Sequence, residues 1–175
     1  VTDDEKVSAL RALVADAVKA IDDIVARLKS GELTEDEERV ELMMLIHIVG
    51  DMHCPMHAGH KSDLGGNTIK VKFFGKQQKL HSVWDSEIVE AAHRWSYTEW
   101  QQQIDRISPK EAKRIAQGTP NDWIEETVIL AADIYEQSPS GANLSYDYVH
   151  HYTPIIEEQL LKGGIRLAAI LEEIY

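Results

Sequence analysis

Residues 47–57, HIVGDMHCPMH, place three histidines and one aspartate within eleven positions of the sequence. Residues 80–85, LHSVWD, supply another histidine and another aspartate. Most other segments have the apolar spacing of ordinary amphipathic helices. These two stretches are therefore where the chain departs from a plain helical scaffold, and they contain its candidate functional residues.

Helical periodicity extends through most of the chain. Apolar residues at helical spacing predict a first helix over residues 4–29, and Thr34 with Glu37 forms a capping box that opens a second helix. We expect this second helix to end at residue 52 or 53, because Pro55 follows. Further helices are predicted at residues 82–94, 97–107, 109–117, 121–136 and 148–175.

A strand-like stretch lies between the two histidine-rich segments. In residues 67–80, NTIKVKFFGKQQKL, apolar residues alternate with lysines before a turn at Gly75, which predicts a small β-hairpin. Residues 138–145, SPSGANLS, are expected to form a loop. The pair Gly163–Gly164 in the last helix allows either a kink or close packing. The predicted fold class is mainly α, with many helices and one small β-hairpin.

The composition limits the class of protein. The chain has 175 residues, of which 43% are hydrophobic and 27% charged, as expected for one soluble globular domain covering residues 1–175. We expect no membrane-spanning helix, because no run of about 18 apolar residues is present. The net charge of −12 argues against a protein that coats DNA through a basic surface, whereas bound metal ions can still attract a phosphate ester.

Each histidine-rich segment contains a His-x-x-x-Asp pair. His47 and Asp51 are four residues apart, as are His81 and Asp85, so each pair is predicted to share one face of a helix. His57 follows the proline that ends the first of these helices. Together the two pairs and His57 offer three imidazoles and two carboxylates without sulfur. This set of ligands is suited to zinc or manganese in a catalytic site. One such pair alone is more often an ion pair or a cap, but the whole set favours metal binding.

The apolar run MMLIHIV, residues 43–49, contains one of these histidines. Burying the bare imidazole of His47 there would be costly, and metal ligation would remove that cost. Met43 and Met44 are predicted to be core residues. The single cysteine, Cys54, excludes an intrachain disulfide and a thiolate metal cluster, and its place at a helix end favours a small buried residue.

Other residues near the two segments have weaker assignments. His53 is two positions from Asp51 and faces away from the ligand side, so we predict an outer partner of the ligands or a hydrogen-bonded structural histidine. Trp84 either lines the site or belongs to the aromatic core. His60 and Lys61 either contact a substrate or lie in an ordinary solvated loop.

The order of these motifs resembles a known family. HIVGDMHCPMH, a loop ending in GGN (65–67), the hairpin and HSVWDSEI (81–88) are together similar to the zinc-dependent single-strand nucleases of the S-one/P-one nuclease family, which shares a superfamily with bacterial zinc phospholipase C. The similarity covers essentially the whole chain and is strongest over residues 47–88. It implies the multi-helix phospholipase C/P-one nuclease-like fold, with a cluster of up to three zinc ions at the base of a cleft.

The resemblance also implies roles for individual residues. His47 would bind the first zinc, and Asp51 would serve the bridged part of the cluster. The second zinc would be held by His57, His81 and Asp85. Asn67 would hold the substrate phosphate or the surroundings of the attacking water. Asp51 is also the predicted catalytic residue, because a carboxylate between ions can orient or deprotonate that water.

The similarity is incomplete before His47. Family members carry an N-terminal tryptophan and further histidine and aspartate ligands upstream, whereas residues 1–46 contain neither a histidine nor a tryptophan. We therefore expect the C-terminal two thirds of a nuclease-like domain, with its N-terminal part missing and fewer zinc ions than the family's three. The lack of the family's disulfides favours a bacterial member.

The activity implied by the resemblance is zinc-dependent endonucleolytic hydrolysis of single-stranded DNA or RNA to 5′-nucleotides, with 3′-nucleotidase activity as a further expectation. Two alternatives stay open: a zinc phospholipase C-like phosphodiesterase and a noncatalytic zinc-binding remnant. The expected partner is single-stranded nucleic acid, with no membrane and no obligatory protein partner. The resemblance implies a secreted or periplasmic location, although the chain shows no signal-peptide pattern.

Overall fold

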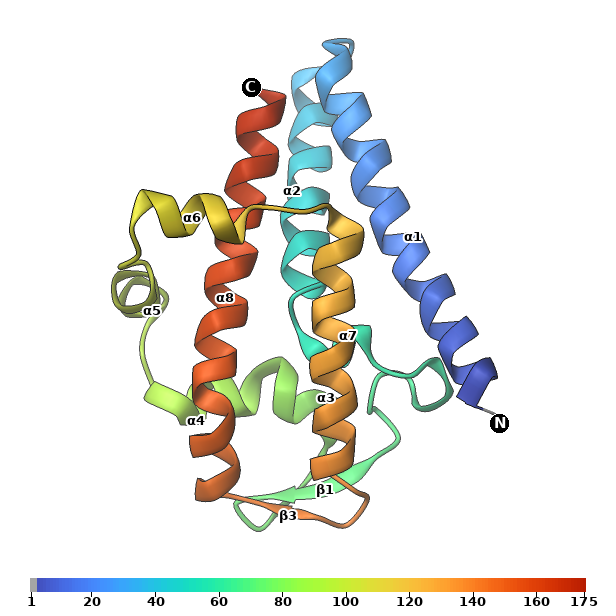
Figure 1. The fold of residues 1–175 in the computed structure, drawn as a ribbon, viewed down its shortest axis with the longest axis vertical. Helices are drawn as coiled ribbons and strands as arrows, with labels where there is room; N and C mark the ends of the chain where they lie inside the picture. Colours follow the sequence, from blue (N-terminus) through green and yellow to red (C-terminus); the bar gives the residue numbers. More distant parts are fainter. Residues whose placement is uncertain (1–2) are drawn as a thin grey trace.

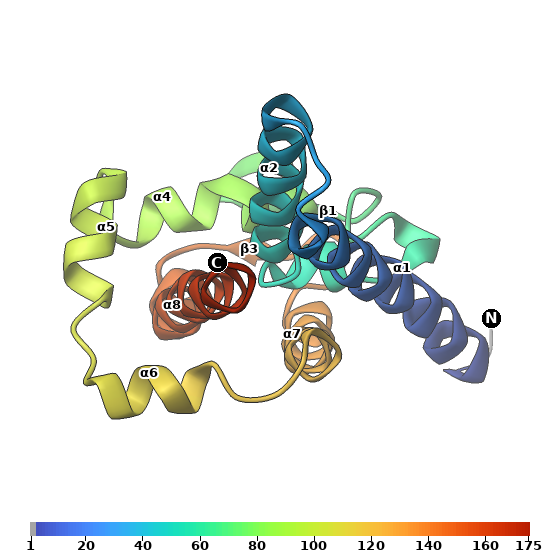
Figure 2. The ribbon, with the colours of Figure 1, turned by 90° about the horizontal axis from the view of Figure 1, so that it is seen from above.

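The structure is a computed structural model that describes the backbone of residues 3–175 and the side chains of residues 16–175. Its long helices lie side by side and roughly along one direction (Figure 1): α1 (Asp3–Ser30), α2 (Glu35–Asp51), α7 (Pro120–Gln137) and α8 (Tyr146–Ile174). Shorter helices surround the outer side of α8 (Figure 2): α4 (Ile88–His93), α5 (Tyr97–Ile104) and α6 (Pro109–Ile115). The prediction of a mainly α-helical fold is confirmed.

Capping residues determine where several helices begin. The Thr34 hydroxyl accepts the backbone N–H of Glu37 at 3.4 Å, and the Glu37 carboxylate accepts the backbone N–H of Thr34 at 2.8 Å, which confirms the predicted capping box. The same reciprocal arrangement opens α5 and α7. α2 ends at Asp51, one residue before the earlier of the two predicted ends, and a short 3-10 helix, Pro55–Ala58, follows.

The β structure is larger than predicted. β1 (Lys70–Phe73) and β2 (Lys76–Lys79) form the expected antiparallel hairpin around Gly75. β3 (Asn143–Leu144) pairs in parallel with β1, so the sheet has the order β2–β1–β3. The expectation that residues 138–145 are entirely loop was therefore wrong. A strand of two residues is too short to show the alternation by which strands are recognised.

The buried side chains of residues 16–175 form a cluster around the sheet and another between the long helices. Both α7 and α8 contribute to each cluster. The segment after α2 lies where the clusters meet, since Met56 belongs to the first cluster and Met52 and Ala58 belong to the second. The backbone that carries the histidine-rich segment is thereby anchored on two sides.

One side of α2 is exposed in the described structure. Leu45 and Val49 are fully buried, and their spacing of four defines the packed stripe of the helix. Met43 is 64% exposed and Met44 is 45% exposed, so the prediction that both are core residues was wrong. The His47 side chain is 66% exposed, and the expected burial cost therefore does not arise here. An apolar run with no polar face could not indicate which side of α2 is packed.

α8 continues through its glycine pair. A Cβ on Gly163 would lie 3.5 to 3.6 Å from the His53 side chain, which is ordinary van der Waals contact, so this position does not itself require glycine. Among residues 3–175, no helix combines the length and hydropathy needed to cross a lipid bilayer.

Candidate metal centre

His57 lies between the two acidic residues of the predicted site. Its Nδ1 is 3.2 Å from Oδ2 of Asp51, and its Nε2 is 3.1 Å from Oδ1 of Asp85. The same Oδ2 of Asp51 lies 3.3 Å from Nε2 of His47, one turn earlier on α2. The structure thus brings together four of the five predicted ligands, with the imidazole of His57 at their centre.

The fifth predicted ligand, His81, stacks beside His57. Their ring centroids are 5.0 Å apart, and the planes are tilted by 35°. Nδ1 of His81 lies 2.8 Å from the carbonyl oxygen of Gly65. A carbonyl oxygen only accepts, so this hydrogen bond places the proton on Nδ1 and leaves the lone pair on Nε2. That nitrogen is therefore the one able to bind a metal.

Asp85 lies in a π-helical turn, Val83–Glu87, which follows α3 (Leu80–Ser82) directly. Single π turns inside helices frequently occur at functional sites, because the wider turn changes which side chains share a face. Trp84 is buried, whereas Asp85 is exposed. One side of the turn is thereby packed into the core while the carboxylate faces the histidines. The predicted α-helical spacing between His81 and Asp85 does not hold across this turn.

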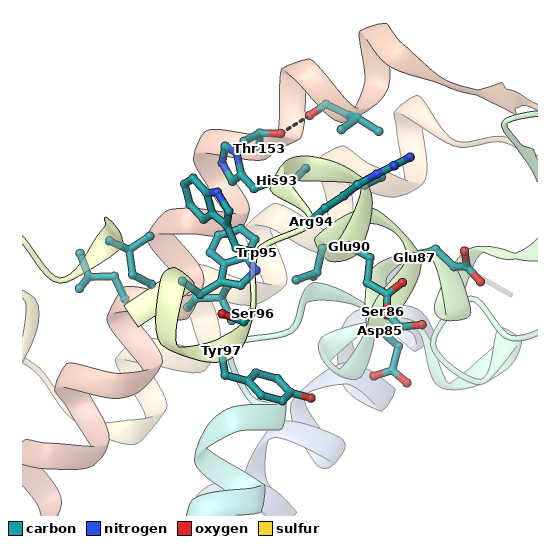
Figure 3. Close-up of a pocket in the computed structure, with 18 of the residues that line it drawn as sticks. Asp85, Ser86, Glu87, Glu90, His93, Arg94, Trp95, Ser96, Tyr97 and Thr153 are labelled. Carbon is teal, nitrogen blue, oxygen red and sulfur yellow. Dashed lines mark hydrogen bonds between the residues drawn. The ribbon is translucent and has the colours of Figure 1, made fainter. Parts of the chain in front are cut away.

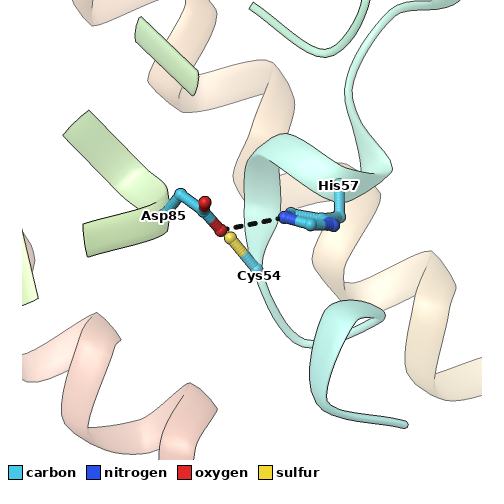
Figure 4. A group of neighbouring side chains, drawn as sticks. All are labelled: Cys54, His57 and Asp85. Carbon is cyan, nitrogen blue, oxygen red and sulfur yellow. Dashed lines mark hydrogen bonds and ion pairs between the residues drawn. The ribbon is translucent and has the colours of Figure 1, made fainter. Parts of the chain in front are cut away.

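Cys54 also lies at this cluster, which the sequence analysis did not predict. Its sulfur, a ring nitrogen of His57 and a carboxylate oxygen of Asp85 lie within 4.8 Å of one another (Figure 4). Burial raises the pKa of the Cys54 thiol to about 11, and the negative charge of Asp85 adds to the rise. Without a cation the thiol therefore stays protonated at neutral pH, and it donates to the carbonyl oxygen of Trp84 at 3.8 Å.

The donors are of the types that a divalent metal requires. Zinc binds nitrogen and oxygen donors at about 2.0–2.1 Å in a tetrahedral arrangement, so two donors on one ion lie about 3.3 Å apart. The nitrogen–oxygen separations at His57 and Asp51 are 3.1 to 3.3 Å, and an imidazole offers only one of its two nitrogens to a metal, so His57 would share an ion with one of its two acidic neighbours through that nitrogen. The side chains are 26% to 66% exposed, which leaves access from solvent. The residues present therefore fit a zinc site.

His53 points away from this cluster. Its Nδ1 donates to the carbonyl oxygen of Val49 at 2.7 Å, and its Nε2 accepts from Nη1 of Arg166 at 3.1 Å. Burial, together with the positive charge of Arg166, lowers the pKa of His53 to about 4. Arg166 in turn donates two hydrogen bonds to Glu126, at 2.8 and 2.9 Å. His53 is thus a neutral, hydrogen-bonded structural histidine, one of the two roles predicted for it.

Trp84 and Asn67, the two other predicted site residues, each make a hydrogen bond within the fold. Trp84 is buried, and its Nε1 donates to the hydroxyl of Tyr148 at 2.9 Å, so it anchors the π turn in the aromatic core. Asn67 is half-buried, and its Nδ2 donates to the carbonyl oxygen of Leu64 at 2.9 Å. This bond fixes the amide at the end of the loop that passes beside His81.

The glycines before Asn67 allow that loop to pass close to the site. Gly65 has a φ of +64°, and a Cβ there would lie 2.3 Å from the carbonyl oxygen of Met56. Gly66 has a φ of +81°, and its Cβ would lie 3.2 Å from the backbone nitrogen of His81. Only glycine combines this backbone conformation with so close an approach.

A large groove begins at the acidic end of the cluster. It has a volume of about 1680 Å³, starts at Asp85 and passes along α4 toward α5 and α8 (Figure 3). Glu87 and Glu90 lie near its acidic end, and Trp95 and Tyr97 lie farther along. The groove therefore has carboxylates beside the cluster, with the cations of Lys76 and Arg94 also in its lining, and the aromatic rings of Trp95 and Tyr97 farther along.

The sequence pattern of the S1/P1 Nuclease family matches residues 4–175. The chain belongs to the S1/P1 nuclease family. It is 34% identical over 151 residues to Endonuclease 4 of Arabidopsis thaliana, which covers 77% of this chain and 50% of that protein. Identity to Nuclease S1 of Aspergillus oryzae is 29%, over 76% of this chain and 53% of that protein. Identity to Nuclease P1 of Penicillium citrinum is 27%, over 91% and 66% respectively.

The family match confirms the resemblance on which the predicted fold rested. The chain spans about half the length of the Arabidopsis relatives that it matches.

Proposed function

We propose that this S1/P1 nuclease family member is a zinc-dependent hydrolase that cleaves phosphodiester bonds in single-stranded nucleic acid. The observation that carries the proposal is the position of His57, whose two ring nitrogens contact Asp51 and Asp85. Relatives that carry the names nuclease and endonuclease support the reaction class. A secreted or periplasmic location is proposed on the family resemblance alone.

In this proposal the metal is held by the predicted ligands His47, Asp51, His57, His81 and Asp85. Oδ2 of Asp51 faces both His47 and His57, so this carboxylate would hold the metal together with both histidines. When bound, zinc supplies a coordinated water of lowered pKa and stabilises negative charge on the phosphate. Fewer than three ions are expected from the residues of this chain.

Acidic residues make substrate binding depend on the metal. Asp51, Asp85, Glu87 and Glu90 lie at or beside the cluster, and the whole chain carries a net charge of −12. Without a cation these carboxylates repel a phosphodiester; bound divalent ions reverse the local field. The amide of Asn67, which donates to the carbonyl oxygen of Leu64 on the neighbouring loop, would supply a further N–H for a phosphate oxygen in this proposal.

The groove supports a single-stranded substrate. It extends from Asp85 to aromatic side chains that include the 96% exposed Tyr97. Unpaired bases stack on exposed aromatic rings with little sequence preference, whereas a duplex keeps its bases stacked inside. A strand whose phosphate lies at the metal cluster is therefore proposed to extend along this groove.

The proposal is tested by incubating the protein with single-stranded DNA, double-stranded DNA or phosphatidylcholine vesicles, each with added zinc and with a chelator. We expect zinc-dependent release of 5′-nucleotides from the single strand at the highest rate. Zinc-dependent cleavage of phosphatidylcholine alone would instead identify a phospholipase C-like enzyme. Zinc binding without turnover of any of the three substrates would identify a noncatalytic zinc-binding protein.

A further inference from the structure

Tyr135 of α7 holds the loop that passes beside His81. Its hydroxyl accepts the backbone N–H of His60 at 3.0 Å and donates to Oδ1 of Asp63 at 2.8 Å. Its ring stacks on the imidazole of His60, with centroids 4.3 Å apart and planes inclined by 24°. One side chain thus makes three contacts with a loop that lies 72 to 75 residues earlier in the sequence.

Asp63 connects this anchor to the glycine pair. The same Oδ1 that accepts from Tyr135 also accepts the backbone N–H of Gly66 at 2.7 Å. The carbonyl oxygen of His60 accepts the backbone N–H of Gly65 at 2.9 Å. The two residues that Tyr135 contacts are therefore the two that fix the backbone of Gly65 and Gly66.

The glycine pair in turn contacts His81 through both of its carbonyl groups. The carbonyl oxygen of Gly65 accepts Nδ1–H of His81 at 2.8 Å, and that of Gly66 accepts the backbone N–H of His81 at 3.3 Å. A continuous set of hydrogen bonds thus extends from the Tyr135 hydroxyl to the imidazole of His81. Outer partners of this kind commonly fix the tautomer and the ring orientation of a metal-binding histidine.

Two further observations indicate that the Tyr135 hydroxyl is held in one position. Burial and the neighbouring carboxylate of Asp63 raise the pKa of Tyr135, so the hydroxyl keeps the proton that it donates. A Cβ on Gly59 would lie 2.6 Å from the Tyr135 hydroxyl oxygen, so the loop approaches it as closely as a glycine permits.

We propose that Tyr135 is a positioning residue for the metal centre, whose hydroxyl fixes loop 60–67 so that the Gly65 carbonyl holds His81 as the Nδ1–H tautomer. The inference rests on the proposed function in one respect, namely that His81 is a metal ligand. The action of Tyr135 on the tautomer of His81 is independent of whether the protein binds zinc or cleaves nucleic acid.

The test compares the wild type with Tyr135→Phe, which removes the hydroxyl and keeps the ring that stacks on His60. In zinc-free protein, at a pH where the imidazole is neutral, nitrogen-15 NMR should show wild-type His81 as the Nδ1–H tautomer and the variant as a mixture of tautomers. Zinc affinity, measured by competition with a chelator, should fall by about 10- to 100-fold. Gly59→Ala, whose Cβ would lie 2.6 Å from the same hydroxyl and 3.0 Å from Cα of Gly65, should change both readouts in the same direction.

Tyr152→Phe is the matched control, because it removes another hydroxyl that donates to an aspartate, Asp133, at 2.8 Å, away from the loop. We expect a comparable loss of thermal stability, the wild-type tautomer of His81 and the wild-type zinc affinity. Wild-type readouts in Tyr135→Phe, or an equal loss of zinc affinity in Tyr152→Phe, would overturn the inference. If the wild type binds no zinc, the proposed function fails, while the tautomer comparison still decides the role of Tyr135.

Discussion

His57 and Asp85 are 28 residues apart in the sequence, yet Nε2 of the first lies 3.1 Å from Oδ1 of the second. The contact joins the 3-10 helix after α2 to the π turn after α3. Neither segment contains a complete site, because each supplies only part of the ligand set. Since His57 also contacts Asp51, it is the residue on which the proposed metal centre depends most.

Replacing His57 with alanine is therefore expected to remove zinc and activity together. The variant leaves Asp51 and Asp85 without the imidazole between them. We expect a clear drop in bound zinc by elemental analysis and a loss of single-strand hydrolysis greater than the 10- to 100-fold typical of outer partners. His151→Ala, at an exposed position on α8, should keep both values. Wild-type zinc content in His57→Ala would remove this residue from the ligand set.

Asp51→Asn removes the negative charge of the side chain while keeping its shape. The amide has nearly the same size, but it cannot supply a negative charge between ions or deprotonate a water. We expect the catalytic rate to fall by at least about 100-fold, the range seen when a group that acts on the reacting atoms is removed. Asp36→Asn, at an exposed site in the first turn of α2, is the control and should keep the wild-type rate. Equal rates for the two variants would exclude Asp51 from catalysis.

Much of the scaffold could be predicted from local patterns. The capping box at Thr34 and Glu37 lies within four residues, and helical periodicity is visible along one segment at a time. The π turn at Asp85 could not be predicted, because α-helical and π-helical spacing give the same apolar pattern over so few residues. The contacts of Tyr135 could not be predicted either, because they join residues 72 to 75 positions apart and leave no periodic signal.

Identifiable sequence features explain how the predicted ligand residues come together. His47 and Asp51 share one face of α2 because their spacing is that of a helical turn. His57 reaches them because the chain turns at Pro55 into a 3-10 helix, as the proline suggested. The sequence did not indicate Cys54 as a ligand. A single cysteine rules out a cluster of several thiolates, but it gives no sign of which side chains lie beside it. A single thiol beside a histidine and a carboxylate is visible only in three dimensions.

Cys54→Ala determines whether this thiol is a ligand. The raised pKa of the partly buried Cys54 means that zinc would have to displace a proton from the thiol before the sulfur could bind. We therefore expect the alanine variant to keep its zinc content and to lose less than about 10-fold in zinc affinity. A cobalt-substituted wild type should show no sulfur-to-metal charge-transfer absorption. Such absorption in the wild type, absent from Cys54→Ala, would add the sulfur to the ligands.

The buried histidine gives a pH dependence of stability with a defined sign. The pKa of His53 falls from 6.5 to about 4 on folding, so between these values the unfolded state binds a proton that the folded state does not. Stability therefore rises with pH from about 4 to about 6.5, and His53 contributes about 3 kcal/mol to that rise. The charged groups that face it are Arg166, Glu126 and Lys162. Urea unfolding of the wild type and of His53→Asn at several pH values gives the free energy of unfolding of each. The slopes of that free energy against pH are then compared.

The variant is expected to be less stable at pH 7, because Arg166 loses the nitrogen that accepts its hydrogen bond. Its stability should nevertheless fall less steeply on acidification from pH 6.5 to 4, so the two curves converge as His53 of the wild type becomes protonated. His150→Asn, which replaces an exposed histidine on α8, should retain the wild-type slope. Parallel curves for His53→Asn and the wild type across this window would show that His53 titrates alike in the folded and unfolded states.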